Sequence, residues 1–192
     1  CSSDLILKQV RIVSSTQPDQ MTRLGEASRH CKSDLFLLLD DSVILHDERV
    51  GVALWDACNT PGAGSASCAL VTETAGAKGA AQLHKSGGWI GLSKGEDCAC
   101  LAKPDLVGYT LPAVFPIAAP DLRCTMMDRA LFQRASESAE CELTLGLAIR
   151  AEGLAHRCLN YVTATSSMTS VEIGNTQTSI PDGVLHIRRH LA

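Results

Sequence analysis

Two adjacent carboxylates, Asp40 and Asp41, are the side chains best suited to chemistry, because they end the apolar run 34–39. Such a continuous run, bounded by charges, is typical of a strand buried on both faces, as in a parallel sheet. Ligands of α/β proteins bind at the carboxyl ends of such strands. Two neighbouring carboxylates repel each other, so a divalent cation or basic groups usually keep both ionised, and a hard cation can hold a diphosphate and stabilise a departing nucleotide. The alternative is that both acids only cap the turn or helix that follows.

The elements expected to position these acids alternate between strands and helices. Apolar runs and alternating patterns predict strands at 7–15, 34–39, 67–73 and 154–164, and residues 124–135 begin as a strand and continue as a helix. Helical spacing of apolar residues predicts helices at 18–32, 47–59 and 139–153. We expect a loop at 61–67, short strands and long loops over 74–108, and an extended segment at 112–120. This order predicts a right-handed α/β layer with a mixed sheet extension.

The composition is that of an ordinary globular domain and argues against several classes of protein. The chain has 192 residues, about the length of one domain with a small appendage, and 45% of them are hydrophobic. A net charge of −4 argues against an electrostatic nucleic-acid binder, which normally carries a basic face. Aromatic residues make up only 4%, too few for platforms that stack single-stranded nucleic acid. No apolar run approaches about 18 residues, so no transmembrane helix is predicted.

Nine cysteines are scattered along the chain, without the CxxC spacing of a zinc or thioredoxin-like site. Several lie in apolar stretches, Cys68 and Cys158 among them, which favours small buried side chains in a reducing compartment such as the cytoplasm. The first residue is Cys1, for which three interpretations stand. They are a mature bacterial lipoprotein, an N-terminal-nucleophile hydrolase that uses this thiol, and a sequence that starts inside a longer protein.

Three segments, taken in order along the chain, resemble the family 2 glycosyltransferases, which have the GT-A fold. Residues 33–50 resemble the metal-binding region of that family, where an apolar strand ends in an Asp-rich motif. Residues 124–135 resemble the segment that lines the acceptor side, and 139–159 resemble the helix whose leading acid is the catalytic base of inverting members. The collinear resemblance covers residues 4–165.

The resemblance implies a role for each acid. Asp41 would contact a metal ion, Mg²⁺ or Mn²⁺, and Asp40 would contact the nucleotide ribose or the same ion. Glu142 falls on the base position when Gly153 is aligned with the family's glycine, and Glu140 is the neighbouring candidate. Such a base deprotonates an acceptor hydroxyl for attack on the anomeric carbon. The alternative for both glutamates is a helix N-terminus stabilised by its acids.

Histidines are weaker candidates. His156, His186 and His190 follow the last predicted helix, where some GT-A enzymes place a metal ligand. A structural or solvent-exposed ring is the alternative for each of them.

The chain also departs from the family pattern. Ser42 stands where the Asp motif has its third acid, Thr144 where the helix usually has a second acid, and Ala148 where it usually has an arginine. The resemblance starts after the family's first two strands, which bind the base and ribose of the nucleotide, with residues 1–4 as a remnant. These departures leave open a degenerate relative that serves in binding or assembly.

The sequence therefore leads to an α/β, GT-A-like fold with a mixed, mostly parallel sheet flanked by helices. We expect a glycosyltransferase-like domain over 1–165, without the first strands, and a C-terminal tail over 166–192. The expected reaction transfers a sugar from a nucleotide-diphospho-sugar to a hydroxyl of a glycan or other acceptor, with a divalent metal at Asp40 and Asp41. The alternatives are a non-catalytic subunit or interaction module of the same fold, bound to a protein partner or a second copy, and the N-terminal-Cys hydrolase or lipoprotein. We expect no nucleic-acid partner and a cytoplasmic location.

Overall fold

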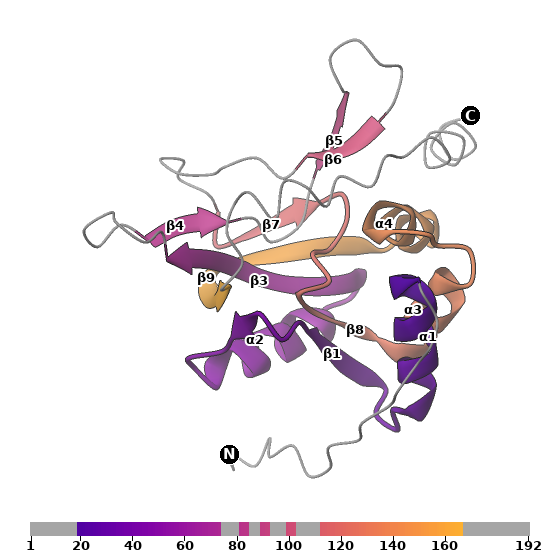
Figure 1. The fold of residues 1–192 in the computed structure, drawn as a ribbon, viewed down its shortest axis with the longest axis horizontal. Helices are drawn as coiled ribbons and strands as arrows, with labels where there is room; N and C mark the ends of the chain where they lie inside the picture. The colour runs from indigo at the N-terminus through magenta and orange to yellow at the C-terminus, as the bar shows by residue number, and fades with distance from the viewer. Residues whose placement is uncertain (1–18, 74–80, 85–88, 93–98, 103–111, 167–192) are drawn as a thin grey trace.

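The computed structural model describes residues 19–73, 81–84, 89–92, 99–102 and 112–166 (Figure 1). The helices are α1 (Gln20–His30), α2 (Arg49–Cys58), α3 (Arg129–Ser136) and α4 (Glu142–Ala151). The strands are β1 (Leu35–Leu39), β2 (Val43–Ile44), β3 (Ala63–Glu73), β4 (Ala81–His84), β5 (Trp89–Leu92), β6 (Ala99–Ala102), β7 (Val114–Ile117), β8 (Cys124–Asp128) and β9 (Ala155–Ser166).

Seven of these strands form one sheet, whose main path runs β1-β8-β3-β9-β2, with β4 paired to β3 and β7 paired to β9. Among the described strands, only β3 and β9 pair in parallel, and the remaining pairs, including a separate β5–β6 pair, are antiparallel. The prediction of a mostly parallel sheet is therefore wrong, although the α/β class is confirmed. An apolar run does not indicate the direction of a strand, and β8 runs opposite to both of its neighbours.

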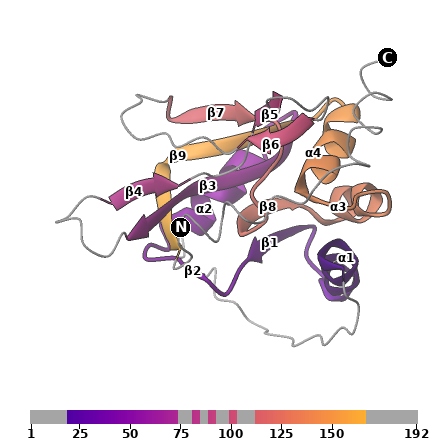
Figure 2. The ribbon, with the colours of Figure 1, turned by 45° about the horizontal axis from the view of Figure 1, so that its top comes forward.

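Helices cover both faces of the sheet (Figures 1 and 2). On one face, Val50 and Leu54 of α2 pack into a cluster with Leu70 and other strand residues. On the other face, α1, α3 and α4 gather around Met127 and Phe132. The described residues therefore form three layers, in which the sheet lies between α2 and the other three helices.

Local signals explain where the helices begin and end. Asp19 caps α1, because its carboxylate accepts a hydrogen bond from the Thr22 N–H at 2.6 Å. Asp128 caps α3 in the same way, through the Leu131 N–H at 2.7 Å. Gly153 follows α4 with a φ of +80°, a conformation that glycine adopts without strain. The helices predicted at 18–32, 47–59 and 139–153 are confirmed as α1, α2 and α4.

Two sequence-based interpretations of the strands need correction. β1 lies at one edge of the sheet, paired within the described chain only with β8, and its side chains are half-buried or exposed rather than buried on both faces. The predicted loop at 61–67 is largely the first half of β3. Its small residues allow close packing, because a Cβ on Gly64 would lie 2.5 Å from Cγ2 of Ile149 on α4. The predicted strand at 7–15 and the tail after Ser166 lie outside the described residues.

His156 fastens α4 to the sheet. Its ring is completely buried, with Nδ1 2.7 Å from the Ser65 hydroxyl and Nε2 2.9 Å from the carbonyl oxygen of Gly146. A neutral ring satisfies both partners when Nε2–H donates to the carbonyl and Nδ1 accepts from the hydroxyl. Burial lowers the pKa of His156 to about 4, against the opposing hydrogen bond to Gly146 and with help from the charge of Arg150. His156 is therefore a structural side chain in this fold.

We expect this histidine to make the protein less stable in mild acid. Since the folded pKa is about 4 and the ordinary value is 6.5, the unfolded chain binds a proton first as pH falls. The contribution to stability is fully present above pH 6.5 and is lost between pH 6.5 and 4, by up to roughly 3 kcal/mol. Urea unfolding of the wild type and of His156→Gln at several pH values measures this loss of stability. Exposed His46 supplies the control His46→Gln, and an equally steep acid loss in His156→Gln would contradict the assignment.

Candidate functional site

Asp40 lies at the end of β1, in a tight turn that leads into β2. Its N–H donates to the carbonyl of Arg123 at 2.9 Å, and its own carbonyl accepts from the Val43 N–H at 3.0 Å. Its carboxylate oxygen Oδ1 accepts from the Ser42 N–H at 2.9 Å, which fixes the side chain in the turn. Asp41 is exposed at the next position. This turn after β1 therefore holds the Asp40 carboxylate in place and leaves the Asp41 carboxylate in solvent.

Glu142 opens α4 and is half-buried there. Its Oε1 accepts a hydrogen bond from the Leu122 N–H at 3.1 Å, so the carboxylate is directed to the turn before β8. The helix start is fixed separately, because the Thr144 hydroxyl accepts from the N–H groups of Glu140 and Cys141 at 2.9 and 3.0 Å. Glu140 is exposed and lies one residue before the cap. Of the two glutamates, Glu142 is the one bonded to the turn that also contacts Asp40.

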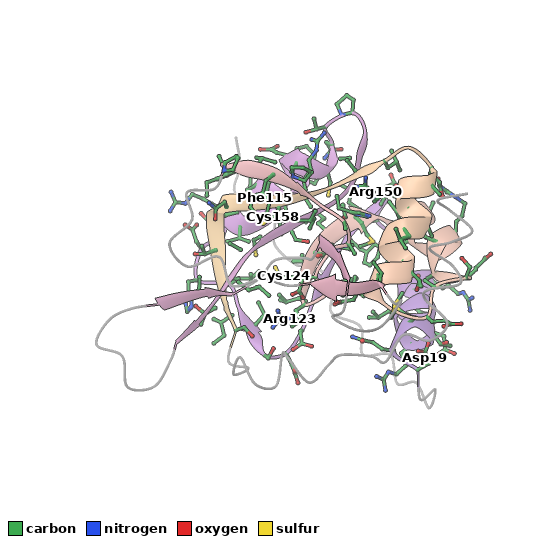
Figure 3. All side chains as sticks on the ribbon, turned by 90° about the horizontal axis from the view of Figure 1, so that it is seen from above. Asp19, Phe115, Arg123, Cys124, Arg150 and Cys158 are labelled. Carbon is green, nitrogen blue, oxygen red and sulfur yellow. The ribbon has the colours of Figure 1, made fainter. Side chains whose placement is uncertain are left out.

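The turn Asp121-Leu122-Arg123 joins these two acids, although they are far apart in the sequence. The Arg123 carbonyl receives the Asp40 N–H, and the Leu122 N–H is donated to Glu142. The turn is itself held by an ion pair, because Arg123 donates from Nε and Nη2 to the two oxygens of Asp121 at 2.9 and 2.6 Å. Figure 3 labels Arg123 beside Cys124, where the turn enters β8.

The electrostatics of this turn extend beyond the ion pair. The Asp121 side chain is 1% exposed and that of Arg123 is 12% exposed. Burial acts to lower the pKa of Arg123, but the hydrogen bonds to Asp121 and the charges of Asp121, Glu142 and Asp40 together raise it. The guanidinium therefore interacts electrostatically with both candidate acids as well as with its bonded partner. Within the described residues, its Nη1 is buried without a hydrogen-bond partner.

Asp40 and Asp41 are the described side chains that would hold a divalent metal ion together with a bound ligand. No group of three or more His, Cys, Asp or Glu side chains is placed to hold a metal ion in the described part of the chain. Mg²⁺, however, is commonly bound through one or two carboxylates together with substrate phosphates. Asp40 and Asp41 supply such carboxylates, and the buried Ser42 hydroxyl beside them has no partner among the described residues. In such a complex, Asp40 and Asp41 would supply part of the coordination of the ion, and the phosphates would supply the rest.

The remaining candidates lie elsewhere. His156 belongs to the core, while His186 and His190 fall outside the described residues. The prediction of buried cysteines is confirmed for Cys68 and Cys158, and burial raises the pKa of the half-buried Cys58 to about 11. Thiols of this kind stay protonated at neutral pH and are poor nucleophiles.

Asp121 and Arg123 are site residues that the sequence reasoning missed. Both stand between the extended segment predicted at 112–120 and the element predicted at 124–135, where no element is predicted. The available signal was an acid and a base two residues apart in an otherwise apolar stretch, since buried charges occur mainly in pairs. That spacing alone gives no indication that the pair contacts the turn after β1.

Comparison of the chain with known protein families and with curated proteins finds no match to either. In the part of the chain that the structure describes, no helix is long and apolar enough to cross a bilayer.

Proposed function

We propose that this chain carries a glycosyltransferase-like site of GT-A type. It transfers a sugar from a nucleotide-diphospho-sugar to a hydroxyl of a glycan or other acceptor, with Mg²⁺ or Mn²⁺ at Asp40 and Asp41. Glu142 is the preferred base and Glu140 the second candidate.

One observation carries this proposal. The backbone N–H of Asp40, at the end of an apolar strand, and the carboxylate of Glu142, at the start of a helix, bond to the same three-residue turn, although the sequence places the two acids about a hundred residues apart. The two acids are those that the resemblance assigns to the donor and to the base. Glu142 is preferred because it bonds to the turn, whereas Glu140 is exposed.

The arrangement suggests a division of labour between the residues. Asp40, fixed by the Ser42 N–H, orients the donor, and exposed Asp41 is open to its phosphates. When bound, a divalent cation neutralises charge on the leaving diphosphate. One carboxylate oxygen of Glu142 accepts the Leu122 N–H. The carboxylate of Glu142 takes the proton of the acceptor hydroxyl as the hydroxyl oxygen attacks the anomeric carbon.

We expect UDP or GDP to bind in the presence of Mn²⁺, and the affinity to fall at least about tenfold in Asp41→Ala and in Asp40→Ala. Titration calorimetry with and without the metal measures it, and the thermal unfolding of each variant reports whether its fold is intact.

Asp56→Ala is the matched control, because Asp56 is an exposed aspartate on α2. It should bind as the wild type does. Wild-type protein that binds neither nucleotide with Mn²⁺ or Mg²⁺ would overturn the transferase proposal and favour the non-catalytic alternative.

A further inference from the structure

The Asp121-Leu122-Arg123 turn is hydrogen-bonded to both candidate acids. Its middle residue gives its N–H to Glu142, and its last residue receives the N–H of Asp40. The turn is also bonded to itself, since the Asp121 carbonyl accepts from the Cys124 N–H at 3.3 Å and from the hydroxyl of Thr125. These bonds leave the turn little freedom to move relative to β8.

The ion pair within the turn is bidentate. Arg123 uses two nitrogens of its planar guanidinium on both oxygens of Asp121, and Asp121 Oδ1 also accepts from the Arg123 N–H at 3.1 Å. Bidentate pairs of this kind fix direction as well as distance. Since the pair is buried, its strength depends little on the salt concentration.

We propose that the Asp121–Arg123 ion pair is the positioning element of the candidate site, holding the turn whose backbone places Asp40 and Glu142 relative to each other. This inference rests on the proposed function for the purpose of the site, but the placement of the two acids can be tested without it. The pair acts through Asp40 and Glu142 and does not itself take part in the reaction.

The double variant Asp121→Asn/Arg123→Met tests the proposal. It removes one charge of each sign, so no charge of the pair is left buried and unpaired. We expect the amides of Leu122 and Asp40 to exchange with deuterium at least about tenfold faster, while the Leu70 amide in β3 stays as in the wild type. We also expect the affinity for the Mn²⁺–nucleotide complex to fall about tenfold, with the midpoint of thermal unfolding changed by only a few degrees.

The exposed ion pair Arg134–Glu152 provides a matched control. Its side chains are 58% and 40% exposed, and Nη2 of Arg134 lies 2.8 Å from Oε2 of Glu152. The variant Arg134→Met/Glu152→Gln makes the same change of charge and should leave both amides and the affinity unchanged. Wild-type exchange at Leu122 and Asp40 in the Asp121→Asn/Arg123→Met variant would overturn the positioning role. Absence of nucleotide binding to the wild type would overturn only the transferase proposal, because the exchange rates still report the placement of both acids.

A measurement on the unaltered protein covers the case in which the double variant does not fold. If the ion pair holds the turn, the Leu122 and Asp40 amides of the wild type must exchange at least about a hundredfold more slowly than the same amides in an unfolded peptide. Exchange of both at peptide rates would contradict the proposal.

Discussion

Replacing Arg123 by methionine alone is expected to lower the free energy of unfolding by about 3–5 kcal/mol. The substitution leaves the carboxylate of Asp121 buried without its bonded cation, because that side chain is only 1% exposed. Removing one member of a buried pair costs far more than removing both, since the remaining charge is out of water. Urea unfolding followed by circular dichroism measures the loss.

Two further variants serve as comparisons for Arg123→Met. Arg134→Met removes the cation of an exposed pair and should cost less than about 1 kcal/mol. Asp121→Asn/Arg123→Met should recover most of the loss of the single variant. Equal costs for Arg123→Met and Arg134→Met would mean that the Asp121 carboxylate is hydrated or protonated in the fold and not paired.

The second large effect is expected at Gly146, in the middle of α4. A Cβ at this position would lie 2.5 Å from the Cβ and 2.7 Å from the Cα of Ala119, and 3.0 Å from the carbonyl oxygen of Ala118. Two of these atoms belong to the backbone, so no rotation of a side chain relieves the contact, and α4 must move. Gly146→Val should cost about 3 kcal/mol or more, at the upper end for overpacking, and lower the midpoint of thermal unfolding by about 6–12 °C.

Gly51 provides the matched control, because it is also helical and a Cβ there meets nothing within 4 Å. Gly51→Ala should stabilise the protein by up to about 1 kcal/mol, the ordinary difference between these residues in a helix. Unfolding of Gly146→Val at the wild-type temperature would contradict the close approach of α4 to residues 118–119.

Elements with strong local signals could be predicted from the sequence. The Asp19 cap, the apolar run before Asp40 and the stop at Gly153 each depend on neighbouring residues, so α1, β1 and α4 were found within a few residues. The boundary of β3 was missed because glycine, alanine and serine are common in loops. Here they serve close packing, since Gly64 lies against Ile149. That reason is visible only once α4 lies over the strand.

In the candidate site too, residues with a local sequence signal could be predicted, and those that depend on distant contacts could not. Asp40, Asp41 and Glu142 were singled out by the positions that they hold along the chain. The turn between them was not, because its role depends on hydrogen bonds to two distant segments. Strand direction was missed for a related reason: the prediction used burial patterns, and those do not distinguish a parallel neighbour from an antiparallel one.

The pairing of β1 with β8 also has a consequence for the order of events during synthesis. Leu39 pairs with Cys124, so the ribosome must make all the residues between them before β1 meets its neighbour. At about 5–20 residues per second, the two strands emerge several seconds apart. Throughout that interval the apolar segment Leu35–Leu39 has no β8 to cover it, and a chaperone that binds such segments has time to act. Asp40 is then among the first residues of the candidate site to leave the ribosome and Glu142 the last, so the two acids come together only after Glu142 has been made.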